Sequence, residues 1–511
     1  MKPARDAAPQ QALMVMGTGS GVGKSFIATG LCRLLARRGY RVAPFKAQNM
    51  SNNAAPAEGG GDEAEIGRAQ ATQAEAAGLR PHVDMNPVLL KPTGDQRAQV
   101  VLLGRSVGHL SAAAYRAQHA RWWDVVSSAY ARLAAANDVV VIEGAGSPAE
   151  FNLRDTDIVN MAVALHTRAN VLLVGDIDRG GVFASLLGTM ALLAPDEAAR
   201  VAGFVINRFR GDASLLAPAF APFTARTHVP VRGVVPYRAD ILVDDEDSQG
   251  LVDADHVRPS ALDIAVVRVP TIANFTDVQQ LAVMPGVAVR YVTRAEQLGN
   301  PDLVIVPGAK DTFAALDFVQ ASGVSGALHA AVRRQIPVLG LCGGYQLLGD
   351  ELVDEHGHGG STGTRRGLGL LPVSTRFGEI KRTRDVRGVT RGSWLFPPGL
   401  AVAGYEIHQG RTHGGEPLLS IARRPEGAVN GLVAGTYVHG LLDAEPVRAA
   451  LVDALWRRRG VAPPRGAPEA LTRLAHYDAI ADLLEAEVDL SGLLPPRPQP
   501  GSPGSRNGSR S

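Results

Sequence analysis

The segment LMVMGTGSGVGKSF, residues 13–26, joins a short apolar run to a glycine-rich loop and then to a helical pattern. Four glycines alternate with other residues in this segment: Gly17, Gly19, Gly21 and Gly23. Backbone N–H groups of such a loop surround phosphate oxygens, and the N-terminus of the following helix adds a positive dipole. Lys24 is placed to reach the β- and γ-phosphates of a nucleotide, and the Ser25 hydroxyl to hold Mg²⁺. The segment therefore predicts a P-loop, with one residue more after Gly17 than the strict motif allows.

Further apolar runs alternate with helical patterns along the chain. In the first half the runs lie at residues 13–16, 41–45, 138–142, 169–174, 201–206 and 231–235. A second series lies at residues 264–269, 288–292, 303–306 and 337–341, and shorter strands with polar turns follow over residues 366–438. Apolar strands that alternate with helices predict parallel sheets with helices on both faces. We therefore expect two α/β domains.

An acidic stretch at residues 244–255 separates the two series, and the domain boundary is expected there. The first domain is expected over residues 1–250 and the second over residues 256–450. Two helices within residues 451–494 are expected to pack on the second domain. The tail, residues 495–511, consists mainly of Pro, Gly, Ser and Arg and is expected to be disordered.

The composition excludes several classes of protein. The 511 residues are 45% hydrophobic and 20% charged, which is typical of a globular chain. The net charge of +2 gives no electrostatic basis for a nucleic-acid or membrane partner. No run of 18 apolar residues predicts a transmembrane helix, and no secretory signal is expected. Two cysteines, Cys32 and Cys342, are too few for a disulfide framework and suit a reducing cytoplasm.

Only six residues are lysine, and the other 46 basic residues are arginine. In such a chain a remaining lysine is expected where a compact ammonium group is needed. Lys46 follows the second apolar run, and Glu143 follows the run at 138–142. The carboxyl ends of parallel strands form the ligand-binding edge of a sheet. Glu143 is therefore predicted as a second Mg²⁺ ligand and Lys46 as the cation between a substrate carboxylate and a phosphoryl group, with Lys91 as the alternative.

The segment GLCGG places Cys342 between an apolar strand and the start of a helix. Small neighbours allow a sharp strand-to-helix turn, which exposes the sulfur at a helix N-terminus, where thiolate is stabilised. A nucleophilic cysteine needs a base. His439, at the end of a late strand, is the preferred base, and His408 is the rival. Backbone N–H groups near Gly308 and at Gly343 are predicted to form an oxyanion hole.

The two motifs together indicate one kind of enzyme. A P-loop with a Mg²⁺ carboxylate uses ATP, and a Cys–His elbow in a separate α/β domain hydrolyses an amide or ester. We infer that Cys342 releases ammonia from glutamine, and that ATP activates a carboxylate to accept the ammonia. The residues alone leave the acceptor open.

Ten longer strings carry a more specific signal. They are PFKAQNMSNN (44–53), GRAQATQAEAAG (67–78), DMNPVLLKPTGD (84–95), VIEGAGSPAEFNLRDTDIVNM (141–161), DIDRGGVFASLLGT (176–189), FVINRFRGD (204–212), NFTD (274–277), LGLCGGYQLLG (339–349), GYEIHQG (404–410) and YVHGLLD (437–443). In these strings the chain resembles the cobyric acid synthases, the glutamine-hydrolysing enzymes of cobalamin biosynthesis. The resemblance covers most of the chain.

The resemblance implies an N-terminal domain of the dethiobiotin synthetase type and a C-terminal class I glutamine amidotransferase domain. It implies amidation of the b, d, e and g carboxylates of adenosylcobyrinic acid a,c-diamide, giving adenosylcobyric acid, with one ATP and one glutamine used in each step. The same comparison gives Lys24, Ser25, Glu143 and Lys46 the roles stated above. It also implies that Asn207 contacts the adenine, and that the partners are small molecules.

Two positions depart from the related patterns. Gly21 and Val22 stand where the family loop usually has Asp-Ala, so a role for that aspartate is not expected here. Many glutaminases of this fold have a carboxylate two residues after the histidine, where this chain has Leu441. Asp443 is off register, so no third member of a catalytic triad is assigned.

Two alternatives stay open at this point. Cobyrinic acid a,c-diamide synthase performs the same chemistry on other carboxylates, and the strings at 46–53 and 84–95 favour cobyric acid synthase over it. A partition-type ATPase switch with a degenerate amidase domain is the second. Such ATPases usually carry a lysine early in the loop, which is absent here, and the intact elbow around Cys342 also disfavours this alternative.

Overall fold

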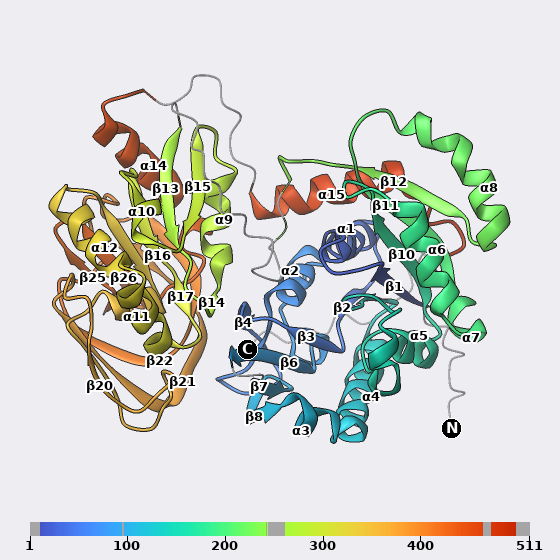
Figure 1. The fold of residues 1–511 in the computed structure, drawn as a ribbon, viewed down its shortest axis with the longest axis horizontal. Helices are drawn as coiled ribbons and strands as arrows, with labels where there is room; N and C mark the ends of the chain where they lie inside the picture. Colours follow the sequence, from blue (N-terminus) through green and yellow to red (C-terminus); the bar gives the residue numbers. More distant parts are fainter. Residues whose placement is uncertain (1–10, 95–96, 242, 244–260, 463–471, 497–511) are drawn as a thin grey trace, which may run out of the picture.

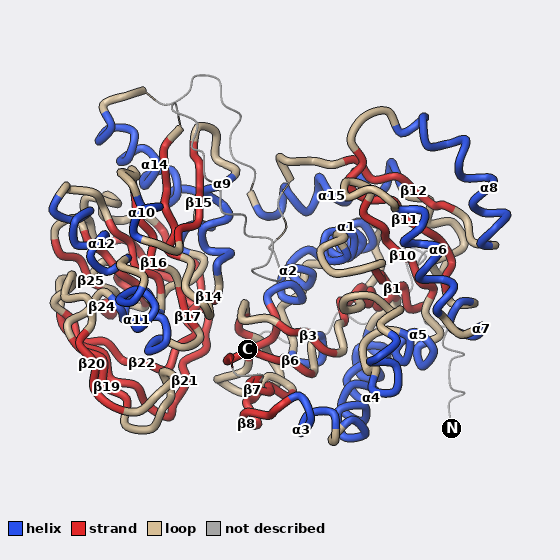
Figure 2. The backbone as a smooth tube through the Cα atoms, in the orientation of Figure 1, coloured by secondary structure: helices blue, strands red, loops and turns tan. Residues whose placement is uncertain are grey.

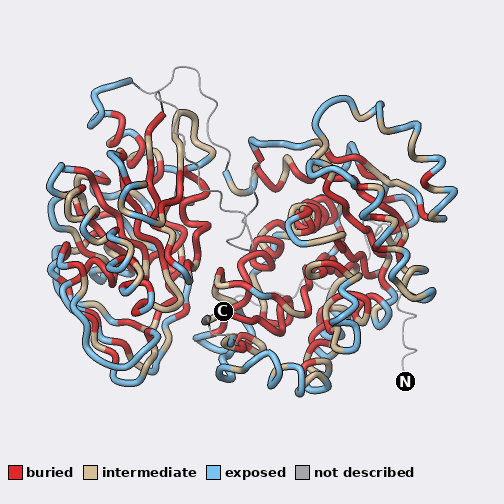
Figure 3. Tube along the Cα trace, in the orientation of Figure 1, coloured by how far each residue is buried: buried red, intermediate tan, exposed pale blue. Residues whose placement is uncertain are grey.

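The computed structural model describes residues 11–94, 97–241, 243, 261–462 and 472–496. Within these ranges the chain forms two α/β bodies that lie side by side (Figure 1). Each has a core of buried strands, with exposed residues on the outside (Figure 3). The expected boundary near residue 255 and residues 497–511 of the expected tail lie outside the described residues.

The N-terminal body is built on a sheet of six parallel strands in the order β12-β11-β10-β1-β9-β2. Their bounds are β1 Gln11–Gly17, β2 Val42–Phe45, β9 Val139–Glu143, β10 Asn170–Asp176, β11 Val201–Phe209 and β12 Val231–Pro236. Residues of β1 alternate between the two faces, as strand geometry requires. Leu13 and Val15 belong to the core cluster under helix α1 (Lys24–Arg37). Met14 and Met16 belong to the cluster on the opposite face.

Helices cover both faces of this sheet, as expected for parallel strands. The second face carries α4 His119–Ala136, α5 Met161–Thr167, α6 Val182–Leu192 and α8 Ala217–Thr227. A smaller sheet in the order β3-β6-β7-β8 lies below the main one (Figure 2). Its strands are β3 Gln48–Met50, β6 Val88–Gly94, β7 Arg97–Leu102 and β8 Arg105–Ser111. Short strands β4 Ala54–Pro56 and β5 Glu65–Gly67 pair with each other, and helix α2 (Arg68–Ala76) follows directly.

The second body has a sheet in the order β15-β13-β16-β18-β26-β25, parallel except for β25. Its strands are β13 Leu262–Val267, β15 Val287–Val292, β16 Leu303–Val306, β18 Val338–Leu341, β25 Ala428–Asn430 and β26 Val433–Thr436. Helices α11 (Thr312–Ala321) and α12 (Val324–Arg333) precede β18, and the short α13 (Gly343–Leu347) follows it. A second sheet contains the long antiparallel pair β21 (Val373–Thr390) and β22 (Ala401–Gly414).

The two C-terminal helices pack on different bodies. Helix α14 (Glu445–Arg459) joins the core of the second body through Leu451, Leu455 and Trp456. It is one continuous helix, so the expected boundary at residue 450 falls inside it. Helix α15 (Arg473–Glu487) instead packs against α1 of the N-terminal body (Figure 1).

The expectation that both helices pack on the second domain is therefore wrong. The physical reason is Gly30 on α1, where an added Cβ would lie 2.4 Å from Ile480 and 2.6 Å from Leu484. The missing side chain lets α15 approach α1 closely. Arg33 then pairs with Asp478 through two hydrogen bonds of 2.8 and 3.0 Å. In the described ranges no helix is both long and apolar enough to cross a membrane.

Candidate active sites

The glycine loop between β1 and α1 has the geometry of a phosphate-binding site. Gly21 and Gly23 have φ values of 71° and 99°, in the left-handed region that favours glycine. The Lys24 ammonium folds back over the loop and donates to the carbonyls of Gly19 at 2.9 Å and Gly146 at 3.0 Å. The loop thus holds its lysine where phosphate oxygens would lie. Contacts of the loop glycines and Ser25 with a nucleotide stay a prediction.

Asn207, at the end of β11, lies against the same loop. Its Nδ2 donates to the Val22 carbonyl at 2.9 Å. A Cβ at Gly23 would lie 2.0 Å from that nitrogen, so only glycine fits between the loop and Asn207. Asn207 therefore supports the phosphate loop in this structure, and its contact with adenine stays a prediction.

A buried polar cluster lies beside the loop at the carboxyl edge of the sheet. Lys46 Nζ lies 2.9 Å from Oε1 of Glu143, and the Ser25 hydroxyl donates to the same oxygen at 3.0 Å. Gln73 on α2 donates to the other carboxylate oxygen. Burial alone would raise the pKa of Glu143, but the charges of Lys46 and Lys24 outweigh it and hold that pKa below its usual value. The site thus keeps an ionised carboxylate beside a buried ammonium.

Lys46 is 2% exposed, which excludes a surface position for this lysine. The donor set also fits Mg²⁺. Mg²⁺ takes oxygen ligands and commonly uses one or two protein groups plus phosphates and water. The Ser25 hydroxyl and the Glu143 carboxylate supply two such oxygens next to the phosphate loop.

An apolar cavity of about 1120 Å³ opens next to this cluster. Its walls come from the small sheet, the segment after β9 and helix α5, and include Met50, Leu90, Val100, Gly146 and Met161. Gly146 is the residue whose carbonyl accepts from Lys24. A large, mostly apolar molecule could therefore reach the phosphate loop from this side.

Cys342 in the second body occupies a strained turn. It follows β18 directly and precedes α13, with φ 51° and ψ −108°. A non-glycine residue with positive φ is costly, and such strain is typical of a nucleophile elbow. Gly340 and Gly344 make the turn possible, since a Cβ at either would lie within 3.0 Å of backbone atoms. The turn leaves the sulfur half-buried in a small cavity.

His439 lies beside Cys342 because their strands are neighbours. Strand β26 runs parallel to β18, so the segments after both strands emerge at the same sheet edge. Nδ1 of His439 lies 2.7 Å from Oδ2 of Asp277, and the other oxygen of Asp277 accepts from the Gly440 N–H at 2.8 Å. Cys342, His439 and Asp277 therefore form a nucleophile–base–carboxylate arrangement.

Asp277 does not follow from any motif in the sequence. It belongs to the NFTD string (274–277) and precedes His439 by 162 residues. No local spacing relates the two positions. The carboxylate beside His439 Nδ1 thus comes from Asp277, far earlier in the chain, while position 441, two residues after the histidine, is Leu441.

The neighbours of His439 set its protonation. Asn274 Oδ1 accepts from the Ala54 N–H at 3.0 Å, which turns Nδ2 of Asn274 toward Nε2 of His439 at 3.2 Å. In the neutral imidazole, Nδ1–H points to Asp277, and the Nε2 lone pair, which accepts from Asn274, is the site that can take the Cys342 proton. Burial would lower the pKa of His439, but Asp277 and Cys342 overcome it and raise that pKa to about 10. The protonated imidazole is therefore favoured once it has taken the proton.

His408 lines the same small cavity, and its Nε2 lies 3.9 Å from Oε2 of Glu406, beyond hydrogen-bond distance. Its Nδ1 lies 2.7 Å from the Gly410 carbonyl, and its ring stacks on Tyr437 with the centroids 3.7 Å apart. Burial holds the pKa of His408 below its usual value, although Glu406 acts in the opposite direction. Of the two candidate bases, only His439 is hydrogen-bonded to a carboxylate.

The expected oxyanion residues also border this cavity. A Cβ at Gly308 would lie 3.6 Å from His439 Cε1 and 3.7 Å from Cys342 Cβ. Gly343 is the first residue of α13 and faces Ala309, whose N would lie 2.8 Å from a Cβ at Gly343. Both backbones are close to the sulfur, and their function as oxyanion donors stays a prediction.

The charge of Asp277 leads to a prediction. In Asp277→Asn we expect kcat for glutamine hydrolysis to fall by about 10²–10³-fold, because an uncharged amide neither orients His439 as well nor stabilises its protonated form. Without that charge the pKa of His439 falls, so the alkaline limb of the kcat/KM profile should move to lower pH. Glutamate release measured from pH 6 to 11 checks both effects. An unchanged alkaline limb would show that Asp277 does not act through His439.

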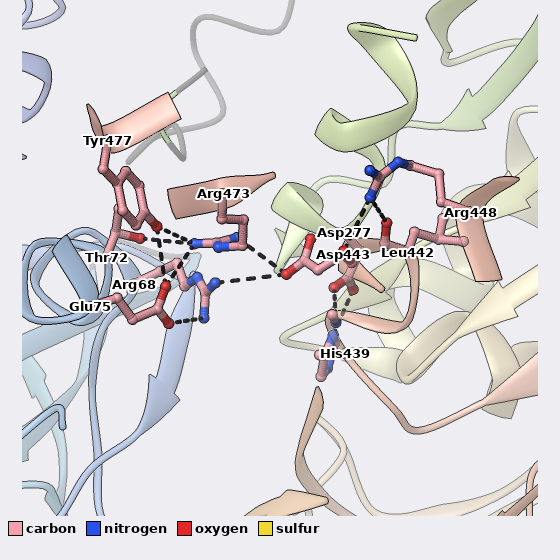
Figure 4. Close-up of polar contacts among 11 residues, drawn as sticks. Arg68, Thr72, Glu75, Asp277, His439, Leu442, Asp443, Arg448, Arg473 and Tyr477 are labelled. Carbon is pink, nitrogen blue, oxygen red and sulfur yellow. Dashed lines mark hydrogen bonds and ion pairs between the residues drawn. The ribbon is translucent and has the colours of Figure 1, made fainter. Parts of the chain in front are cut away.

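Residues of the N-terminal body contact the neighbours of His439. The guanidinium of Arg68 on α2 lies 5.4 Å from the ring centroid of Tyr405, and this ring stacks on His439 at 5.3 Å. Such a distance is within cation–π range. Arg68 also lies 3.9 Å from Asp443, which pairs with Arg473 at the start of α15 (Figure 4). Contacts from both α2 and α15 therefore end on the segment that carries His439.

The fold and the two sites define a class: a glutamine amidotransferase domain joined in one chain to a P-loop nucleotide-binding domain. Residues 13–251 match the CobQ/CobB/MinD/ParA nucleotide-binding domain, and residues 263–447 match the CobB/CobQ-like glutamine amidotransferase domain. The chain is 49% identical to a cobyric acid synthase of Sorangium cellulosum, covering 93% of this chain and 96% of that protein. It is 51% identical to a cobyric acid synthase of Desulforudis audaxviator, covering 94% and 98%. The chain belongs to the cobyric acid synthase family and is a glutamine-hydrolysing ligase.

This result confirms the resemblance and the fold class expected from the sequence. It also removes the alternative of a non-enzymatic ATPase switch. The nucleotide-binding and amidotransferase domains support the use of ATP and glutamine.

Proposed function

We propose that the chain amidates the b, d, e and g carboxylates of adenosylcobyrinic acid a,c-diamide, with ATP and glutamine, to give adenosylcobyric acid. The observation that carries the proposal is the presence in one molecule of two side-chain clusters with the groups that these reactions need. The Cys342–His439–Asp277 arrangement can release ammonia, and the Lys24–Lys46–Glu143 cluster beside the phosphate loop can activate a carboxylate. The identity to cobyric acid synthases over nearly the whole chain supports the acceptor.

Glutamine hydrolysis follows from the first site. His439 Nε2 takes the Cys342 proton, and the thiolate attacks the side-chain amide carbon. The oxyanion is held by N–H groups at Gly308 and Gly343. The C–N bond then breaks as the His439 imidazolium protonates the leaving ammonia. Water, deprotonated by His439, attacks the thioester and releases glutamate.

Carboxylate activation follows from the second site. A substrate carboxylate oxygen attacks the γ-phosphorus of ATP, the bond to ADP breaks, and an acyl phosphate forms. Ammonia attacks the acyl carbon, and phosphate leaves. Lys46 offsets the repulsion between the carboxylate and the phosphate, and Lys24 binds phosphate oxygens. Ser25 and Glu143 would hold Mg²⁺, which when bound neutralises phosphate charge.

The apolar cavity next to Gly146 fits the acceptor. A corrin ring is large and mostly apolar and carries its carboxylates at the rim. A ring in this cavity would present a rim carboxylate to the phosphate loop, because the cavity shares Gly146 with the Lys24 site. Four carboxylates could be presented in turn by rotating the ring between steps.

A comparison of the two histidines tests the base. His439→Ala should lower glutamine hydrolysis by about 10²–10⁴-fold, the usual scale for a general base. His408→Ala, in the same cavity and also buried, is the matched control and should cost much less. Glutamate release by both purified variants checks the ranking, and the reverse order would move the base to His408.

The acceptor is tested by incubating the purified chain with glutamine, ATP, Mg²⁺ and adenosylcobyrinic acid a,c-diamide, followed by mass spectrometry. Four successive mass steps from carboxylate to amide are expected. Cobyrinic acid without the two amides is the control substrate. Two steps on that compound and none on the diamide would identify a cobyrinic acid a,c-diamide synthase instead.

A further inference from the structure

Three of the six lysines gather around one buried carboxylate between the two bodies. Lys91 Nζ lies 2.6 Å from Oε2 of Glu65, and Lys381 pairs with the other oxygen. Glu65 is 2% exposed. Both its oxygens are therefore occupied, and the positive charges hold the pKa of Glu65 below its usual range against the effect of burial.

Lys310 is the third lysine of this cluster. Its Nζ donates to the neutral side-chain oxygen of Gln99 at 2.6 Å, and within the described residues it forms no ion pair. Burial, together with the charges of Lys91 and Lys381, lowers the pKa of Lys310 to about 7. Three lysines thus lie around one carboxylate. An anion bound at Lys310 would relieve this excess of positive charge.

The cluster lies at the junction of two cavities. The deep cavity, of about 80 Å³, is lined by Cys342 and His439. The vestibule, of about 1080 Å³, lies further out. The residues that line both are Lys310, His358, Lys381 and Gln409. A molecule that reaches the sulfur from the vestibule must therefore pass the two lysines.

Glutamine has the shape and charge for this path. Its side-chain amide must reach Cys342 in the deep cavity. Its α-carboxylate, separated from the amide carbon by three carbons, then lies toward the junction. The vestibule also has carboxylates, Asp311 and Glu379 among them, that suit the α-ammonium group. From the deep cavity outward, the protein presents the sulfur, then the lysines, then the acidic residues. A bound glutamine would present its side-chain amide, its α-carboxylate and its α-ammonium group in the same order.

We propose that Lys310 binds the α-carboxylate of glutamine, with Lys381 and Lys91 adding positive charge at the same junction. This inference rests on the proposed glutaminase function of Cys342. The glutamine site is then shared between the bodies, because Lys91, Glu65 and Gln99 come from the N-terminal body. Lys310 and Lys381 come from the second body.

The test compares glutamine with L-glutaminamide, whose α-carboxylate is replaced by an uncharged amide. Ammonia release from each compound is measured for the wild type, Lys310→Met and Lys310→Arg. A hydrogen bond to a charged group contributes about 1.5–3 kcal/mol, so the wild type should prefer glutamine by about 10–10²-fold in kcat/KM. In Lys310→Met this preference should fall to within about threefold, mainly through KM for glutamine. Lys310→Arg should keep part of it.

Two controls separate the possible outcomes. Arg387→Met removes a positive charge from an exposed position on β21, the strand of Lys381, and should keep the full preference. Lys310→Gln, which can still contact Gln99, gives the same readout should Lys310→Met not fold. Ammonia-dependent amidation should be unchanged in every folded Lys310 variant.

A folded Lys310→Met that keeps the wild-type preference would overturn the inference. So would a raised KM for the corrinoid with an unchanged KM for glutamine, since the anion would then belong to the acceptor. Failure of the wild type to release ammonia from glutamine would instead contradict the proposed function itself.

Discussion

Cys342→Ala should abolish amidation with glutamine as the nitrogen donor, by about 10⁴-fold or more, and leave amidation with high free ammonia intact. At 1.36 kcal/mol per decade, this loss corresponds to about 5.4 kcal/mol of transition-state stabilisation. The sulfur is the only nucleophile placed at the elbow, and alanine cannot form the thioester. Free ammonia needs no thiolate, because the acyl phosphate forms in the other body. Mass spectrometry of the corrinoid with each nitrogen donor measures both results.

The second cysteine provides a matched control. Cys32 is fully buried on α1, in the core between the sheet and α15, and burial holds the pKa of its thiol well above the usual value. Cys32→Ala should keep both activities, at a stability cost of about 1 kcal/mol for the lost packing. An alkylating reagent should label Cys342 and spare Cys32. Loss of the ammonia reaction in a folded Cys342→Ala protein would show that ammonia release and carboxylate activation do not occur at separate sites as proposed.

Lys46→Met should lower amidation with either nitrogen donor by about 10²-fold or more, about 2.7 kcal/mol at 1.36 kcal/mol per decade. Two anions must approach within bonding distance during carboxylate activation, and Lys46 is the buried cation beside the phosphate loop. Methionine keeps most of the bulk and removes the charge. ATP should still bind through Lys24 and the loop, and glutamine hydrolysis measured alone should persist. Product formation with glutamine and with ammonia, and nucleotide affinity, are the measurements.

Removing Lys46 also leaves Glu143 buried without its ammonium partner, which destabilises a protein by about 3–5 kcal/mol. The fraction of folded Lys46→Met protein is therefore measured together with its activity, so that loss of folding is not mistaken for loss of catalysis. Lys91→Met is the contrast. The structure places Lys91 on Glu65, where it lines the cavity of Cys342, so this variant should impair the glutamine reaction and spare the ammonia reaction. Near-normal corrinoid amidation by folded Lys46→Met would remove Lys46 from the mechanism.

Local patterns were sufficient for the parts of the sites that one segment supplies. The glycine loop, the elbow around Cys342 and the apolar strands each have spacings with a direct physical cause. Asp277 and Lys310 could not be found in this way, since each acts with residues far away in sequence. Asp277 meets His439 only because the 3-10 helix Phe275–Val278, which follows β14 (Ile272–Ala273), lies against the segment after β26. Lys310 faces Gln99 only because the two bodies dock.

The packing partner of α15 could not be predicted from local sequence either. An apolar stripe indicates that one face of a helix is buried, but it does not identify the surface against which that face packs. The surface here is α1, and its identity depends on Gly30, more than 440 residues earlier, where the absence of a side chain makes room for Ile480. A glycine inside a helix is not by itself a sign of such a contact.

The position of α15 has a consequence for how the chain folds during its synthesis. The first body is made of residues near both ends of the chain, because α15 completes the core under α1 through Tyr477, Ile480 and Leu484. A nascent chain emerges from the ribosome N-terminus first. The apolar face of α1 that contacts α15 therefore stays exposed until the whole amidotransferase domain has been translated. Closing the first body is then among the last events of folding, so that a chain truncated before residue 473 would expose this face permanently.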